Sequence, residues 1–171
     1  MTGSSDAQFI QLINQNLGIA HKVCRVYFSD TPEQEDVLQE MMYQLWKSYQ
    51  RFDGRSKFST WMYSVCLNTA LTYRRKNKNN RSETITRKHL EIPEQGTGHQ
   101  EENSRMLFQA IATLSPLNKA IILLYLDDLS YEEIAGITGL TKSNVSVKLV
   151  RIKKELEVQL KNLNIQNDGN S

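Results

Sequence analysis

Residues that interrupt helices are scarce in this sequence, with three prolines and eight glycines among 171 residues. No apolar run approaches the ~18–20 residues that a membrane-spanning helix needs. The polar start, residues 1–8, also lacks the basic and apolar segments of a secretory signal. Since 39% of the residues are hydrophobic, packed cores can still form. We therefore expect a largely helical, cytoplasmic protein without membrane insertion.

Cysteine is equally scarce, and only Cys24 and Cys66 are present. Both lie among apolar residues within predicted helices, where a free thiol packs as a small hydrophobic side chain. A disulfide is not expected in the reducing cytoplasm. His21 and Cys24 have the spacing of half a zinc site, but the sequence offers no second ligand pair at zinc spacing. A structural role is therefore favoured for Cys24, and no cofactor is expected.

The sequence patterns of common enzyme active sites are missing. There is no phosphate-binding glycine loop, no cluster of metal ligands, and no Ser or Cys paired by pattern with a base. The three histidines, His21, His89 and His99, fall in a predicted helix and in a polar central segment. We therefore expect no enzymatic activity.

The net charge of +2 is too small to indicate a nucleic-acid-binding protein, but the charges are unevenly distributed. An early segment is acidic, and two later segments are basic. The acidic residues are Asp30, Glu33, Glu35, Asp36 and Glu40, and the basic ones are Arg74, Arg75, Lys76, Lys78, Arg81, Arg87, Lys88, then Lys142, Lys148, Arg151, Lys153 and Lys154. Separate patches of opposite sign predict two partners, an extended polyanion and a protein.

Apolar residues recur at steps of three and four in two parts of the chain, which predicts amphipathic helices. Between these parts, polar residues dominate and Pro93, Gly96 and Gly98 interrupt any helix. The sequence predicts an all-α fold with an N-terminal helical bundle and a C-terminal four-helix domain that contains a helix-turn-helix. The predicted bounds are 6–76 for the first domain, 77–103 for a flexible linker, 104–163 for the second domain and 164–171 for a disordered tail.

Residues 129–156 have the pattern of a helix-turn-helix. Ser130 and Glu133 fit a capping box, Gly139 marks the turn, and Thr141 is positioned to cap the last helix. Such a second helix places its N-terminal residues in the DNA major groove. A solvated helix of a plain bundle is the alternative, but the caps, turn and cations together favour DNA binding. The predicted contacts are Lys142, Ser143, Asn144, Lys148, Arg151 and Lys154.

Residues 36–76 form a second informative block. Asp36, Gln39 and Glu40 lie opposite the apolar stripe of one helix, which indicates either a solvated face or a protein interface. An aromatic-rich turn follows, and then a helix that ends in three consecutive cations. Aromatic rings beside cations suit single-stranded nucleic acid, although Phe58 and Trp61 by themselves are more typical of a core.

The two blocks in this order resemble the bacterial RNA polymerase sigma factors of the sigma-70 family, in their short two-domain extracytoplasmic-function (ECF) form. The first block contains DVLQE, LW, RFDGRSKFSTWMY, LN and YRR, and the second is LSPLNKAIILLYLDDLSYEEIAGITGLTKSNVSVKLVRIKKEL. The resemblance implies a factor that binds core RNA polymerase and directs it to promoter DNA. It also makes an anti-sigma protein a hypothesis for a further partner.

The resemblance further implies roles for individual residues. The helix with Asp36, Gln39, Glu40 and Trp46 is expected to bind the polymerase clamp coiled coil. The DNA of the melted minus-10 element is expected to contact Phe52, Asp53, Arg55, Lys57, Asn68, Thr72, Arg74, Arg75 and Lys76. A flipped base is expected at the turn, Arg55 and Lys57 at phosphates, and Arg74, Arg75 and Lys76 at the upstream backbone. The last helix is expected to recognise the minus-35 duplex. Ser146 and Val150 stand where relatives often carry a cation and a polar residue, so the DNA sequence that is recognised is expected to differ.

A stand-alone helix-turn-helix regulator remains the main alternative. Such a protein needs its own dimer surface or ligand pocket to gain specificity. Neither is apparent in the sequence, and association with core polymerase would separate the two interpretations.

Overall fold

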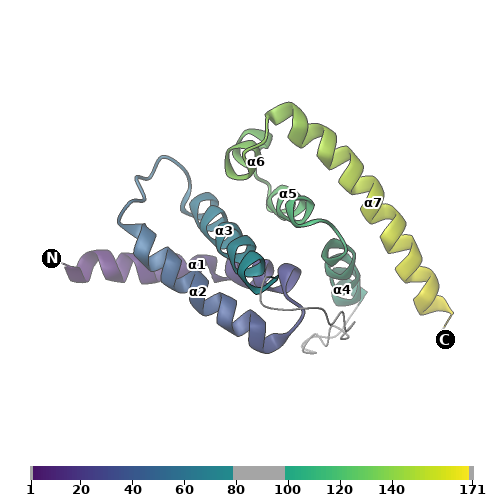
Figure 1. The fold of residues 1–171 in the computed structure, drawn as a ribbon, viewed down its shortest axis with the longest axis horizontal. Coiled ribbons are helices and arrows are strands. Elements are labelled where there is room, and N and C mark those ends of the chain that lie inside the picture. The colour runs from purple at the N-terminus through teal and green to yellow at the C-terminus, as the bar shows by residue number, and fades with distance from the viewer. Residues whose placement is uncertain (1, 79–98, 170–171) are drawn as a thin grey trace. The chain divides into compact units, whose positions relative to one another are not determined.

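The computed structural model describes residues 2–78 and 99–169, and the regular structure in these ranges is entirely helical. The first range contains α1 (Thr2–Tyr27), α2 (Thr31–Tyr49) and α3 (Phe58–Lys78). The second contains α4 (His99–Ala112), α5 (Pro116–Leu126), α6 (Tyr131–Thr138) and α7 (Lys142–Asp168) (Figure 1). The chain divides into two compact units, Met1–Leu90 and Glu91–Ser171. The predicted all-α fold class is confirmed.

Helices extend beyond all the predicted domain bounds, and α1 already begins at Thr2, before the predicted start at residue 6. α3 continues to Lys78 and α4 begins at His99, so both reach into the range 77–103 that was predicted as linker. Apolar residues are sparse there, but Glu101 and Glu102 lie in the first turn of α4, where the helix dipole favours carboxylates. Residues 79–98 of the predicted linker lie outside the described residues.

The predicted tail, 164–171, is also helical through Asp168. An i,i+4 ion pair between Lys161 and Glu157 supports this part of α7 at 3.1 Å. In addition, the Asn167 amide lies 3.6 Å from the Met106 sulfur of α4. These local and tertiary contacts extend the helix past the last strong apolar position. None of the described helices is long and apolar enough to span a bilayer.

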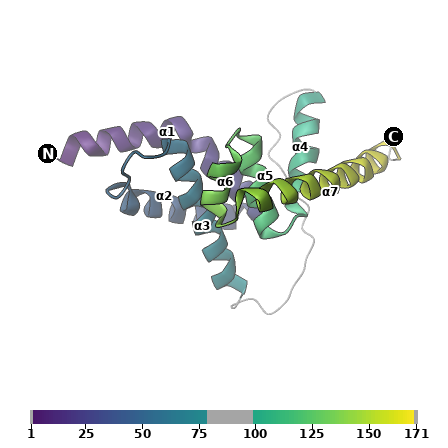
Figure 2. The same cartoon turned by 90° about the horizontal axis from the view of Figure 1, so that it is seen from above.

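The core of the first unit lies where α1, α2 and α3 contact one another (Figure 2). Each helix buries residues at steps of three or four, as an amphipathic helix does. The buried residues include Ala20, Val23 and Cys24 of α1, Val37, Met41 and Leu45 of α2, and Met62, Cys66 and Ala70 of α3. Every one of these helices therefore presents its opposite face to solvent.

Both thiols are buried in this core, as expected. The Cys24 thiol donates to the Met41 sulfur at 3.7 Å. Burial raises the pKa of Cys24 to about 11 and the pKa of Cys66 to about 12, so both thiols stay protonated at neutral pH. They pack as small apolar side chains, which is the role that their apolar neighbours in the sequence indicated.

Three side-chain caps and one glycine set the helix ends of the second unit. The Ser130 hydroxyl accepts from the Glu133 N–H at 3.1 Å, and the Glu133 carboxylate accepts from the Ser130 N–H at 2.8 Å. Ser115 caps α5, and the Thr141 hydroxyl accepts from the Asn144 N–H at 3.1 Å. The capping box and the Thr141 cap that the sequence predicts are therefore confirmed.

Gly139 ends α6 in a left-handed conformation, with φ of 75°, and its N–H donates to the Ala135 carbonyl at 2.9 Å. This turn sends the chain into α7, which contacts α4, α5 and α6. Val145, Leu149, Ile152 and Leu156 form the buried stripe of α7. The turn and this stripe together fix which side of α7 faces outward.

Two alanine substitutions, one inside α6 and one at the residue that ends it, are expected to change stability in opposite directions. Gly139→Ala should destabilise the second unit by about 1 kcal/mol, because an L side chain resists positive φ. Gly136→Ala should stabilise it by about 0.5 kcal/mol, because Gly136 lies inside the helix. A Cβ at either position meets no atom within 4 Å, so packing does not contribute to the difference.

Hydrogen–deuterium exchange of the α6 and α7 amides in the full chain measures both effects. Exchange should quicken in Gly139→Ala and slow in Gly136→Ala. Changes of the same sign in the two variants would contradict the assignment of the turn.

Candidate functional site

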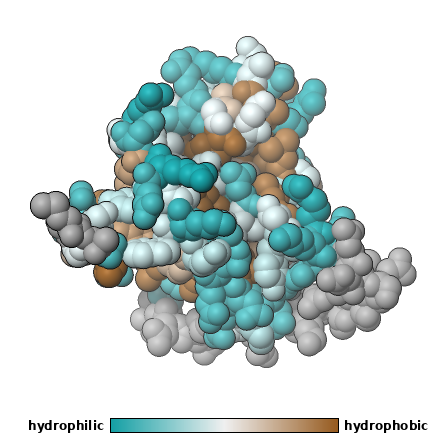
Figure 3. Space-filling view, turned by 60° about the vertical axis from the view of Figure 1, so that its left-hand side comes forward, coloured by the Kyte–Doolittle hydropathy of each residue, from teal (hydrophilic) through white to brown (hydrophobic). Residues whose placement is uncertain are grey.

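The side of α2 that faces away from the core carries two exposed aromatic residues. Tyr43 is 55% exposed and Trp46 is 50% exposed. Asp36 and Gln39 are also exposed, and the steps of three, four and three residues place all four on one side of the helix. We call Asp36, Gln39, Tyr43 and Trp46 the α2 outer face. Figure 3, which colours one side of the whole molecule by hydropathy, shows that hydrophobic residues reach the surface among hydrophilic ones.

Three of the four residues predicted to bind polymerase therefore lie together, but Glu40 does not lie with them. Glu40 is half-buried and accepts a hydrogen bond from the Gln44 amide at 2.8 Å. It lines a pocket between α2 and α3. Tyr43 was missed by the sequence reasoning, although its spacing from Gln39 and Trp46 was a sufficient signal.

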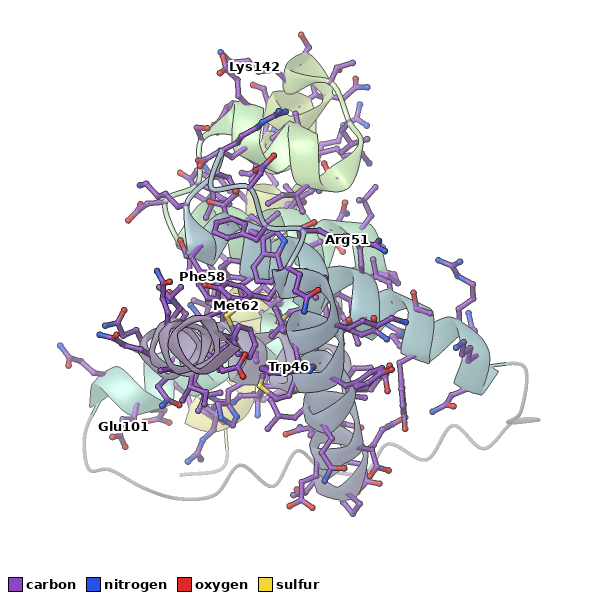
Figure 4. All side chains as sticks on the ribbon, turned by 90° about the vertical axis from the view of Figure 1, so that its left-hand side faces the viewer. Trp46, Arg51, Phe58, Met62, Glu101 and Lys142 are labelled. Atoms are coloured by element: carbon purple, nitrogen blue, oxygen red, sulfur yellow. The ribbon has the colours of Figure 1, made fainter. Side chains whose placement is uncertain are left out.

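A cluster of six aromatic rings joins the end of α2 to the start of α3. Tyr49 contacts Phe9 of α1, with ring centroids 4.8 Å apart. Phe52 lies 5.1 Å from Trp61 and 5.8 Å from Phe58, and Trp46 contacts Phe9 at 5.5 Å (Figure 4 labels Phe58 and Trp46). Rings at these distances stabilise one another beyond their buried area. The cluster therefore anchors both ends of the turn at residues 50–57.

Phe52, which was predicted to contact DNA, belongs to this cluster and is half-buried. Trp61 is half-buried too, and it packs against Phe52 of the turn, in keeping with the core character expected of Phe58 and Trp61. The neighbouring predicted residues Asp53, Arg55 and Lys57 are all exposed. The Asp53 carboxylate accepts from the Arg55 backbone N–H at 3.0 Å and pairs with its guanidinium at 3.1 Å. Asp53 and Arg55 thus form an exposed surface pair, of the kind that contributes little to stability.

A pocket of about 570 Å³ opens between α2 and α3. Asn68, Thr72 and Lys76 of α3 line one side, and Glu40, Gln44 and Ser48 of α2 line the other. Asn68 and Thr72 are exposed, so their polar groups are available at the surface. The pocket is therefore lined by amides, hydroxyls, a carboxylate and a cation.

The three consecutive cations at the end of α3 do not all lie on the same side of the helix. Lys76 lines the pocket, and Arg75 is exposed nearby on the helix. Arg74 is half-buried, and it lies two residues after Thr72, a spacing that places two side chains on different sides of a helix. The structure thus separates Arg74 from Asn68, Thr72 and Lys76.

The outward side of α7 contains most of the residues predicted to bind duplex DNA. Ser143, Asn144, Arg151 and Lys154 are exposed, whereas Lys148 is half-buried at the edge of the buried stripe. Val147 and Val150 are exposed among them. The sequence reasoning noted Val150 only as a departure from relatives, and it did not consider Val147.

Two cations of the second unit are held by neighbouring side chains. The Lys142 ammonium, at the start of α7, pairs with Glu132 of α6 at 3.2 Å; Figure 4 labels Lys142. Exposed pairs of this kind contribute little to stability and separate readily. Lys153 donates to the Tyr125 hydroxyl at 2.9 Å and lies 4.2 Å from the centre of that ring, and the hydrogen bond raises the pKa of Lys153.

Comparison with known families matches both units. Residues 12–80 match the family model Sigma-70 region 2, and residues 104–156 match the model Sigma-70, region 4. The ECF RNA polymerase sigma-E factor of Haemophilus influenzae is 30% identical over 141 residues, which cover 75% of each chain. The sigma-E factor of Escherichia coli K12 is 29% identical over 153 residues, which cover 80% of each chain.

Two solved structures share the fold. The sigma factor RpoE of Bartonella quintana, solved with the anti-sigma factor NepR, has a TM-score of 0.70 at 20% identity, over 90% of this chain and 97% of that one. The protein CnrH, solved with the cytosolic domain of CnrY, has a TM-score of 0.65 at 18% identity, over 91% and 89%. The all-α arrangement is therefore one that known sigma factors adopt.

The aromatic cluster predicts that Phe52 has a structural role that Arg55 lacks. Phe52→Ala should lower the free energy of unfolding of the first unit by about 2 kcal/mol, less than a fully buried phenylalanine would. Arg55→Ala should change it by less than about 0.5 kcal/mol, because Arg55 is exposed. Urea unfolding followed by tryptophan fluorescence reports on this unit, which holds both tryptophans. Equal stability losses in the two variants would show that the cluster does not anchor the turn.

Proposed function

This chain belongs to the ECF family of bacterial RNA polymerase sigma factors, and on that premise we propose how its two units divide the work of promoter recognition. The first unit binds core polymerase and the melted minus-10 element, and the second binds the minus-35 duplex. The observation that carries this proposal is the presence of both sigma-70 regions in order, at residues 12–80 and 104–156. The proposed modules are residues 6–76 and 104–163, with the described helices reaching somewhat beyond these bounds.

We propose that the α2 outer face binds the polymerase clamp coiled coil. Exposed aromatic side chains are enriched at protein interfaces, where they supply much of the binding energy. Tyr43 and Trp46 provide such anchors, and Asp36 and Gln39 add groups that suit basic and polar partners. Glu40 lies toward α3, so its contribution to this interface is expected to be smaller.

Capture of the melted strand is proposed for the turn at residues 53–57 and the pocket beside α3. Removing a base from its stack costs a few kcal/mol, which contacts to the base and backbone must offset. The Asn68 amide and Thr72 hydroxyl are suited to the hydrogen-bonding edge of a base, and Lys76 at the same pocket is suited to a phosphate. Arg55, Lys57 and Arg75 extend the cationic surface along the strand. Phe52 and Asp53 support this surface from beneath and beside it.

The outward side of α7 is proposed to enter the major groove of the minus-35 element. Asn144 lies in the first turn after the Thr141 cap, which is where a recognition helix reads base edges. Lys148, at the edge of the buried stripe, is expected to contact base edges beside Asn144. Arg151 and Lys154 are placed for phosphates, and Lys142 joins them when its pair with Glu132 opens.

The proposed mechanism consists of binding steps only, so the chain needs no catalytic group of its own. It acts in the cytoplasm, where RNA polymerase transcribes. We also propose an anti-sigma protein as a regulatory partner, since the RpoE structure was solved with one. A stand-alone regulator would instead bind operator DNA without polymerase.

Two asparagine-to-alanine variants test the division of labour. With the chain bound to core polymerase, Asn68→Ala should weaken binding of a single-stranded minus-10 oligonucleotide about five- to tenfold, the effect of losing one or two hydrogen bonds. It should leave binding of a minus-35 duplex unchanged. Asn144→Ala should weaken binding of the minus-35 duplex and leave binding of the minus-10 oligonucleotide unchanged. Fluorescence anisotropy with labelled DNA measures both affinities.

Each variant is the control for the other, since both replace an exposed asparagine on a helix. If each substitution weakened both kinds of DNA equally, the assignment of one DNA form to each unit would be wrong. Tight binding of the duplex by the chain without polymerase would favour the stand-alone regulator.

A further inference from the structure

Two valines lie on the outward side of α7. Val147 is 50% exposed and Val150 is 55% exposed. Val145 and Leu149, on either side of Val147 along the chain, are buried. Because the buried stripe faces the core, Val147 points almost directly away from it. Val150 follows three residues later, on the same outward side.

Neither helix formation nor packing within the unit accounts for these two residues. Valine is a weaker helix former than alanine, lysine or glutamine, because its branched side chain loses rotamer freedom in a helix. An exposed apolar side chain also gains little from burial in the free protein. Single exposed apolar residues are common on protein surfaces, but these two adjoin each other on the surface that carries Asn144 and Arg151.

The charges around the valines indicate the kind of partner that covers them. Arg151 and Lys154 are exposed on the same part of the helix, and Asn144 supplies an amide beside Val147. Cations around an apolar centre complement DNA, whose phosphates flank a groove lined by bases. The alternative is a protein partner whose helix covers the valines with apolar side chains and pairs its acidic rim with the cations. The experiment below distinguishes such a partner from DNA.

We propose that Val147 and Val150 contact the 5-methyl groups of thymines, so that the chain favours thymine at the base pairs facing them; this rests on the proposed function of α7. A valine side chain has no hydrogen-bonding group and cannot read the edges of guanine, cytosine or adenine. The thymine methyl is the one apolar feature among the unmodified bases in the major groove. Three residues along a helix advance about 4.5 Å, so the two valines reach neighbouring base pairs.

Replacing single thymines by deoxyuridine tests this inference, because deoxyuridine lacks only the methyl group. The substrate is the minus-35 duplex that the chain selects from a random pool when it is bound to core polymerase. For the wild-type chain, replacement at the thymines facing the valines should weaken binding about fourfold each, the factor expected for one buried methyl group. The Val147→Ala and Val150→Ala variants should each lose the sensitivity to deoxyuridine at one position.

Val158→Ala is the matched control. Val158 is 57% exposed on the same helix, beyond the part that enters the groove, so this variant should keep the full wild-type sensitivity. Alanine favours the helix at all three positions, so loss of folding does not confuse the result. Sequence-selective binding with no penalty at any deoxyuridine, or with the same penalty in the valine variants, would overturn the inference while the proposed function stands. Failure of the wild-type chain to select any duplex would overturn both.

Discussion

Each long helix of this protein can bury only one side, and the choice of that side determines every proposed interface. In α7, Val145, Leu149, Ile152 and Leu156 are buried, which turns Asn144, Val147 and Arg151 outward. In α2, burial of Val37, Met41 and Leu45 does the same for the outer face. Successive residues on a helix point in very different directions, so a core shifted by one position would present different groups. Apolar burial, the largest favourable contribution to folding, therefore also orients the binding groups.

The two units use this constraint for different partners. The α2 outer face combines aromatic rings with a carboxylate and an amide, a composition typical of protein interfaces. The outward side of α7 combines cations, an amide and two valines, which suits a DNA groove. A third surface of the first unit, the pocket at Asn68 and Thr72, presents amide, hydroxyl and charged side chains beside apolar ones. A single chain can thus hold an enzyme, a separated strand and a duplex, because the three surfaces are formed by different side chains.

Local sequence signals predicted the second unit well because its helix ends depend on short-range contacts. The Ser130–Glu133 box and the Thr141 cap each join residues three positions apart. The positive φ of Gly139 likewise follows from the turn between two capped helices. Residues outside the apolar stripe of a helix were expected to face solvent. This expectation was correct for most of the outward residues of α7 and for three of the four residues predicted on α2 to bind polymerase.

Contacts between distant residues could not be predicted in this way. The pair between Lys142 and Glu132 depends on how α6 and α7 cross, and the contact between Asn167 and Met106 depends on how α4 meets α7. The aromatic cluster brings Phe9 of α1 to Tyr49 of α2, far along the chain. The separation of Arg74 from Thr72, in contrast, follows from helix geometry alone and was available in the sequence.

The most direct measurement for the whole account is transcription in vitro from genomic DNA fragments, with core polymerase alone and with this chain added. Mapped transcript starts should appear only when the chain is present, and the DNA upstream of them should share two elements at constant separation. Core polymerase that gives the same transcripts with and without the chain, or a chain that never co-purifies with polymerase, would contradict the claim that this protein is a promoter-selecting subunit.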